Sequence, residues 1–165
     1  GRIGQAIARK FEPFNAKIVY HARNKKLVNY IYYDNLLEMA KVSDVLICVT
    51  PGGAETFNLV NEQVINALGP KGTLINVSCG LVVDEKALIA ALKEGRLGWA
   101  GLDVFAAEPK VPAALLWLNN VVLLPFVGSA TKETRTAMGN LTVDNLLQHL
   151  RDGAVINPIP ECADL

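Results

Sequence analysis

Short apolar runs alternate with helical patterns along this chain, and this alternation restricts the fold more than any other feature of the sequence. Five runs rich in Val, Ile and Leu are typical of buried strands: residues 17–20, 44–50, 73–78, 99–104 and 121–124. Four stretches between them place apolar residues three or four apart, as amphipathic helices do: residues 3–14, 35–42, 61–68 and 84–94. Strands alternating with helices predict an α/β fold with a doubly wound parallel sheet.

Capping residues indicate where two of the helices begin and end. Asp84 is expected to cap the helix that follows it and Gly95 to end that helix, because these residue types satisfy the orphan groups of helix termini. Thr131 is expected to open a longer helix that stops near Gly153. Beyond that helix, Asn157–Pro160 is expected to be extended, because proline disfavours helix there.

The composition fits one ordinary domain, which we place at residues 1–150, followed by a tail over residues 151–165. Sixteen basic and 16 acidic side chains cancel, so neither nucleic acid nor an anionic membrane is an expected partner. No apolar run reaches the roughly 20 residues that span a bilayer. The three cysteines, Cys48, Cys79 and Cys162, are far apart and favour no disulfide framework or metal site, which fits a reducing, cytoplasmic location.

The first residues run directly into a helix. A turn such as Gly1-Arg2-Ile3-Gly4 is normally fed by a strand, which lies at the centre of a doubly wound sheet with strand order 3-2-1-4-5-6. We therefore expect a fold that lacks its first, central strand, as a fragment or a truncated product would. The alternative is that another segment takes the place of that strand.

The same four residues fit the second half of the dinucleotide-binding pattern G-x-G-x-x-G. Gly1 would let the backbone approach a pyrophosphate, Gly4 would let helix and strand pack closely, and the helix N-terminus would present free N–H groups. By itself the pattern is weak, because glycines at helix starts are common.

The segment after the first predicted strand favours NADP(H) over NAD(H). An NAD site places a carboxylate there to bind the ribose 2′-hydroxyl, but residues 20–26 contain none. Ala22, Arg23 and Asn24 form the turn, and the guanidinium of Arg23 suits a 2′-phosphate. A solvated basic loop is the alternative interpretation. His21 is expected near the adenine pocket.

Several motifs in register resemble the signatures of the D-2-hydroxyacid dehydrogenase family: Asn76–Gly80, Gly101–Phe105, Glu108–Pro109, Val121–Pro125 and Gly128–Thr131. The resemblance runs from Gly1 to about Leu150, and the turn at residues 21–23 resembles the NADP-using glyoxylate/hydroxypyruvate reductases. It implies a Rossmann-like domain, hydride transfer from NADPH to a 2-oxo acid, and a homodimer. It also implies a separate substrate-binding domain, built mostly from residues before the cofactor turn and missing from this chain.

The resemblance assigns the catalytic positions residue by residue. The family's substrate-clamping arginine corresponds to Cys79, its histidine to Phe126 and its glutamate to Glu108, so only the glutamate is retained. Cys79 has no fixed positive charge, and Phe126 has no proton to donate. We therefore expect little or no reductase activity. A reactive thiol at Cys79 is a weaker hypothesis, because no base or cation is identified beside it.

The resemblance and the cofactor pattern together place the nucleotide on 14 positions. These are Gly1, Arg2, Ile3, Gly4, Ala22, Arg23, Asn24, Thr50, Pro51, Val77, Ser78, Cys79, Asp103 and Gly128. Asp103 matches the aspartate that lies beside the nicotinamide ring in the family. The alternative to a degraded reductase is a non-catalytic, nucleotide-sensing interaction module on a dehydrogenase scaffold.

Overall fold

The computed structural model describes residues 1–159 and divides the chain into two compact units, Gly1–Pro125 and a second unit that begins at Phe126. The strands of the first unit are β1 (Val19–His21), β2 (Ile31–Tyr33), β3 (Val45–Cys48), β4 (Thr73–Asn76), β5 (Trp99–Leu102) and β6 (Val121–Leu123). Its α-helices are α1 (Arg2–Phe11), α2 (Leu36–Lys41), α3 (Glu62–Leu68), α4 (Glu85–Lys93) and α5 (Ala113–Leu116). Three 3₁₀ turns complete the unit: η1 (Glu12–Phe14), η2 (Ala54–Thr56) and η3 (Gly80–Val82).

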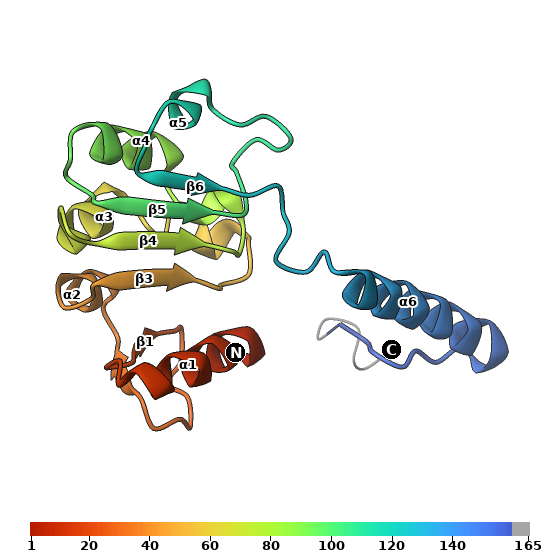
Figure 1. Ribbon diagram of the computed structural model, residues 1–165. Helices are drawn as coiled ribbons and strands as arrows, with labels where there is room; N and C mark the ends of the chain where they lie inside the picture. Colours follow the sequence, from red (N-terminus) through yellow and green to blue (C-terminus); the bar gives the residue numbers. More distant parts are fainter. Residues whose placement is uncertain (160–165) are drawn as a thin grey trace. The chain divides into compact units, whose positions relative to one another are not determined.

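The strands form two parallel sheets in place of one continuous sheet (Figure 1). One sheet has the order β3-β4-β5-β6, and the other consists of β1 and β2. Within residues 1–159, no strand pairs with the second edge of β1 or of β3. The α/β class and the missing central strand are thus both confirmed, because a doubly wound sheet places its first strand at this break.

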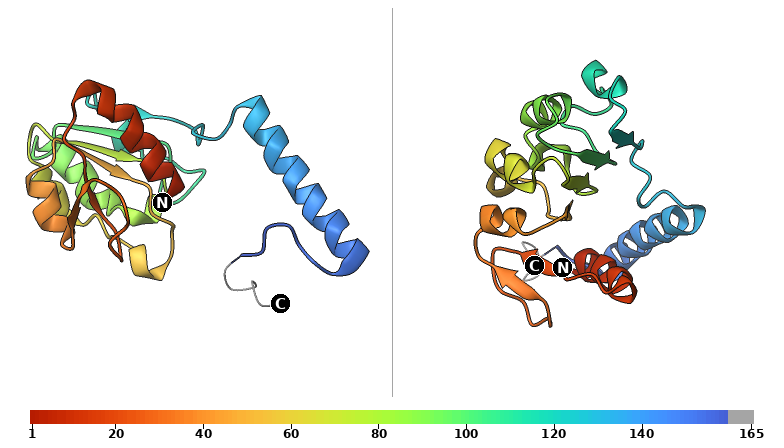
Figure 2. Two further views of the ribbon diagram at one scale, coloured as in Figure 1. Left: turned by 90° about the horizontal axis from the view of Figure 1, so that it is seen from below. Right: turned by 60° about the vertical axis from the view of Figure 1, so that its left-hand side comes forward.

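Helices cover both faces of the first unit. Figure 2 shows α2, α3 and α4 in a row along one face and α1 on the other. The core lies between the larger sheet and that row, where Ile65, Leu74 and Leu88 are almost fully buried. Apolar residues at helical spacing thus meet a sheet whose inner face is apolar.

Most predicted elements are present, with differences that have local causes. The predicted cap of α4 is confirmed, since the Ala87 N–H donates to Asp84 Oδ1 at 3.0 Å and Gly95 has a φ of +71°. The first helix ends as an α-helix at Phe11 and continues as a 3₁₀ turn around Pro13. One strand and one α-helix were not predicted: β2, which has three residues, and α5, which has four.

The second unit contains one long helix, α6 (Lys132–Asp152). Its predicted ends are confirmed, because Thr131 Oγ1 accepts the Thr134 N–H at 3.2 Å and Gly153 ends the helix with a φ of +79°. The helix therefore extends into the range predicted as tail, and residues 153–159 contain no helix or strand. Pro160 and Cys162 lie outside the described residues. No helix in residues 1–159 has the length and hydropathy of a membrane span.

Candidate functional site

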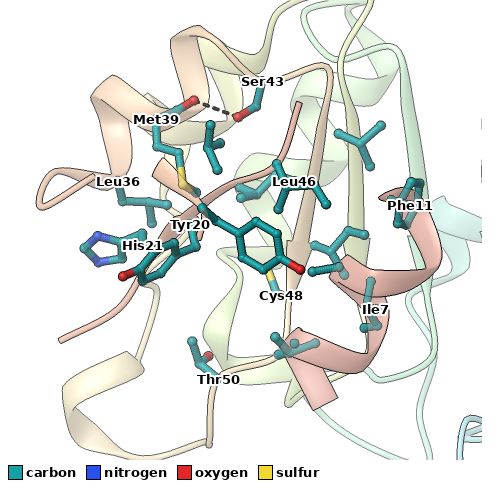
Figure 3. A pocket seen from close by; sticks show the side chains of 18 of the residues that line it. Ile7, Phe11, Tyr20, His21, Leu36, Met39, Ser43, Leu46, Cys48 and Thr50 are labelled. Atoms are coloured by element: carbon teal, nitrogen blue, oxygen red, sulfur yellow. Dashed lines mark hydrogen bonds between the residues drawn. The ribbon is translucent and has the colours of Figure 1, made fainter. Parts of the chain in front are cut away.

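A cavity of about 490 Å³ lies in the first unit between the edges of β1 and β3 (Figure 3). Four residues singled out from the sequence line it where the two strands end: Gly1, Gly4, His21 and Thr50. In a parallel α/β sheet, the carboxyl ends of the strands are where ligands bind. The fold therefore brings the two halves of the predicted nucleotide site, the glycine turn and the end of β3, to one place.

The glycine turn presents the N-terminus of α1 toward this end of the cavity. No side chain caps the first turn, so its N–H groups keep their capacity to bind an anion. A Cβ atom at Gly4 would lie 3.3 Å from Val49 Cγ2, so the absence of a side chain there lets α1 approach the end of β3. Arg2 and Ile3 are exposed on the first turn.

Thr50 follows β3 and carries a polar atom without a partner. Its Oγ1 is buried and neither accepts nor donates a hydrogen bond among the described residues. Burying an unpaired hydroxyl costs about 1–3 kcal/mol, so a ligand that pairs with it gains affinity. A nucleotide, which carries ribose hydroxyls and phosphate oxygens, fits this position. The next residue, Pro51, is exposed, and its carbonyl accepts a hydrogen bond from Thr56 Oγ1 at 2.8 Å.

The turn after β1 is anchored by tyrosine and histidine side chains. Tyr32 Oη donates to the Ala22 carbonyl at 3.1 Å, and His21 Nδ1 donates to the Tyr33 carbonyl at 3.0 Å. Asn24 is exposed. These bonds hold the turn that carries Arg23.

Arg23 is exposed and forms an ion pair that sequence reasoning missed. Its Nη1 donates to Glu55 Oε2 at 2.6 Å, across 32 positions of the chain. The pair is largely solvated, with side-chain exposures of 75% and 72%. An exposed pair of this kind contributes at most about 1 kcal/mol, so a stronger anion can replace the carboxylate.

The loop after β4 is organised by a buried amide, Asn76, which is 1% exposed. Its Oδ1 accepts from the Ser78 N–H at 3.1 Å and from Ser78 Oγ at 2.8 Å, and its Nδ2 donates to the Cys79 carbonyl at 2.9 Å. The Asn76 carbonyl in turn accepts the N–H of the buried Asp103 at 3.0 Å. One side chain therefore positions the loop that carries Val77, Ser78 and Cys79.

Gly80 allows that loop to pack against the segment after β5. A Cβ atom at Gly80 would overlap the carbonyl group of Phe105. Glu108 lies in the same segment, where its Oε1 accepts the Phe105 N–H at 3.0 Å. The Cys79 thiol is partly buried, and a Cβ atom at Gly52 would lie 2.8 Å from its Sγ.

The remaining predicted positions lie in the second unit. Phe126 is 57% exposed and has a φ of +55°, in the left-handed region, and Gly128 is also exposed.

Within residues 1–159, no group of three or more His, Cys, Asp or Glu side chains could hold a metal ion. Cys48 lies in the cavity wall, and burial raises the pKa of its thiol to about 12.

Comparisons with known proteins agree with this arrangement. Residues 1–128 match the model of the family described as D-isomer specific 2-hydroxyacid dehydrogenase, NAD binding domain. A hydroxyphenylpyruvate reductase of Plectranthus scutellarioides is 51% identical over 160 residues, which cover 96% of this chain and 51% of that protein. A glyoxylate/hydroxypyruvate reductase A of Arabidopsis thaliana is 49% identical, with 96% and 51% covered.

Solved structures give the same relationship. The NADPH-dependent glyoxylate/hydroxypyruvate reductase of Sinorhizobium meliloti, in complex with NADP and malonate, matches with a TM-score of 0.96 and 49% identity, over 98% of this chain and 51% of that chain. A glyoxylate reductase from Paecilomyes thermophila matches with a TM-score of 0.91 and 32% identity, over 98% and 50%. The chain thus spans about half the length of these relatives, and it belongs to the D-isomer specific 2-hydroxyacid dehydrogenase family, of which it carries the NAD-binding domain.

Proposed function

We propose that this chain is the NADP(H)-binding domain of a reductase of the glyoxylate/hydroxypyruvate type, and that the chain itself has little or no activity. In such a reductase the bound cofactor supplies the hydride that reduces a 2-oxo acid. The domain's own contribution is to hold the nucleotide, with the N-terminus of α1 facing the phosphates and Thr50 at the end of β3.

The unpartnered hydroxyl of Thr50 is the observation that carries the nucleotide assignment. It lines the same cavity as Gly1 and Gly4, which leave room for a phosphate at an uncapped helix terminus. Dinucleotides bind in parallel α/β sheets where a helix N-terminus meets the carboxyl ends of the strands, and Thr50 lies at such an end.

The preference for NADP(H) rests on charge. Residues 20–26 contain three cationic side chains and no carboxylate. The planar guanidinium of Arg23 can donate two parallel hydrogen bonds to a 2′-phosphate. A dianionic phosphate competes better for Arg23 than the solvated carboxylate of Glu55 does. The Sinorhizobium meliloti relative, which is NADPH-dependent, supports the same choice.

The lack of turnover rests on side-chain chemistry at two positions. Cys79 is neutral as a thiol and cannot pair with a substrate carboxylate, and Phe126 has no proton to give to the developing alkoxide. Loss of the general acid alone slows such a reaction by roughly 10²–10⁴-fold. Glu108 is retained, but its carboxylate accepts the backbone N–H of Phe105.

Calorimetric titration with NADPH and NADH, followed by incubation with glyoxylate or hydroxypyruvate, tests the proposal. We expect NADPH to bind more tightly than NADH, and no substrate-dependent loss of NADPH absorbance. Replacing Arg23 by Gln should remove the preference for NADPH and leave NADH binding unchanged. Equal affinity for the two cofactors would contradict the NADP(H) assignment, and substrate-dependent oxidation would contradict the predicted inactivity.

A further inference from the structure

The loop between β1 and β2 carries Arg23 and two lysines, Lys25 and Lys26. Residues 22–30 contain no helix or strand, and residues 23–27 are all exposed. Neither lysine forms an ion pair with another described residue. A loop that moves freely loses conformational entropy when it binds an anion, and this loss lowers its affinity. Contacts that hold the loop before the anion binds therefore raise that affinity.

The hydroxyl of Tyr20 holds one end of this loop. The Lys26 N–H donates to Tyr20 Oη at 2.9 Å, and the same hydroxyl donates to the Lys26 carbonyl at 3.1 Å. Both bonds are possible at once because a hydroxyl has one donor and two acceptor positions. The two bonds close residues 20–26 into a ring in which Arg23 is the middle residue.

A second tyrosine holds the other end of the loop. Tyr32 lies opposite Tyr20 in the pairing of β1 with β2, and the two ring centroids are 5.3 Å apart, which is a contact distance for aromatic side chains. Tyr32 Oη donates to the Ala22 carbonyl at 3.1 Å. Residues 22–26 are therefore anchored at both ends by two tyrosines that contact each other on paired strands. We call Tyr20 and Tyr32 the tyrosine clamp.

We propose that Tyr20 determines cofactor specificity as a positioning residue, because its hydroxyl holds the Arg23 turn in the conformation that binds a 2′-phosphate. That hydroxyl is engaged with the Lys26 backbone, so Tyr20 acts through Arg23 and does not itself contact the phosphate. NADH has no 2′-phosphate, so the tyrosine clamp should affect the binding of NADPH alone. This role rests on the proposed function, since it requires that Arg23 bind the 2′-phosphate.

Tyr20→Phe tests the hydroxyl, because the variant keeps the ring and its contact with Tyr32. Calorimetric titration of the full chain should show about fivefold weaker binding of NADPH and unchanged binding of NADH, which is the effect of about one net hydrogen bond. Hydrogen exchange at the Lys26 amide should become faster, because this N–H loses its acceptor.

Tyr30→Phe is the matched control, since it removes another hydroxyl from the same loop. Tyr30 Oη donates to Glu12 Oε1 at 2.7 Å and makes no hydrogen bond with residues 22–26. This variant should leave the affinities for both cofactors unchanged.

Three measurements separate positioning from a general loss of structure. Adenosine 2′,5′-bisphosphate and adenosine 5′-monophosphate differ by the 2′-phosphate alone, and Tyr20→Phe should weaken the binding of the first by about fivefold and leave the second unchanged. In an Arg23→Gln background, Tyr20→Phe should cause no further loss of NADPH affinity, because the two residues act as one unit. Tyr32→Phe, which frees the Ala22 carbonyl, should lower the ratio of NADPH to NADH affinity as Tyr20→Phe does.

Several results would overturn this role of Tyr20. They are equal losses of NADPH and NADH affinity in Tyr20→Phe, an equal effect of Tyr30→Phe, and an undiminished effect of Tyr20→Phe in the Arg23→Gln background. If the unsubstituted chain prefers NADPH through Arg23 and Tyr20→Phe keeps that preference, the positioning role is wrong and the proposed function stands. If the unsubstituted chain binds the two cofactors equally, the NADP(H) assignment and the role of Tyr20 are both wrong.

Discussion

Asn76 connects the fold to the candidate site, and its replacement by alanine should disturb both. The substitution removes the three hydrogen bonds that its side chain makes with Ser78 and Cys79. A net contribution of about 0.5–1.5 kcal/mol for each of the three bonds gives a loss of roughly 1.5–4.5 kcal/mol in the free energy of unfolding. Because the side chain is 1% exposed, water does not replace these partners without rearrangement of the loop.

Urea unfolding monitored by tryptophan fluorescence measures the loss of stability, and alkylation of Cys79 under native conditions measures the loosening of the loop. A Cys162→Ser background keeps the thiol count to Cys48 and Cys79. Asn61→Ala is the matched control, since Asn61 caps α3 through the Val64 N–H at 3.1 Å. Asn61→Ala should lower the free energy of unfolding by about 0.5–2 kcal/mol and leave the rate of Cys79 alkylation unchanged. Unchanged stability and unchanged Cys79 reactivity in Asn76→Ala would refute the positioning role.

Three further substitutions or conditions probe separate parts of the molecule. Gly80→Ala should lower the melting temperature in a thermal scan, because the new methyl overlaps the carbonyl of Phe105 and overpacking costs about 1–3 kcal/mol or more; an unchanged melting temperature would contradict this. Glu55→Gln should raise the ratio of NADPH to NADH affinity in calorimetry, because Arg23 loses the carboxylate that competes with the 2′-phosphate. A lowered ratio would contradict this, because it would show that Glu55 favours the binding of NADPH. The raised pKa of Cys48, about 12 against an ordinary 9.0, should make the free energy of unfolding fall as the pH rises above 9.0, since the unfolded chain releases this proton first. Cys48→Val should flatten that slope in urea titrations at successive pH values.

The order of the elements could be predicted because it depends on local patterns. Continuous apolar runs and capping residues such as Asp84 act over a few neighbours, and the structure places those strands and that cap as expected. The strand β2 was missed because Ile31–Tyr33 is too short to form a periodic pattern and owes its structure to pairing with β1. The helix α5 was missed for the same reason, because a single turn of four residues is too short to show a helical repeat of apolar positions.

The candidate site could be predicted in part. Gly1, Gly4 and Thr50 meet at one end of the cavity, as a parallel sheet requires of turns at its carboxyl edge. The partner of Arg23 could not be predicted, because Glu55 lies 32 residues away and reaches it only through the fold. Asn76 had one visible signal, a polar residue at the end of a buried strand, but its role depends on the path of the loop that follows.

We propose that the nucleotide binds where β1, β3 and the N-terminus of α1 meet. A titration of the isotope-labelled chain with NADPH, monitored by backbone amide shifts in NMR spectra, tests it most directly. We expect saturable shifts at residues 2–4, 22–24 and 50, with residues 121–123 unaffected. Shifts confined to other surfaces, or no shifts at a saturating concentration of NADPH, would contradict it.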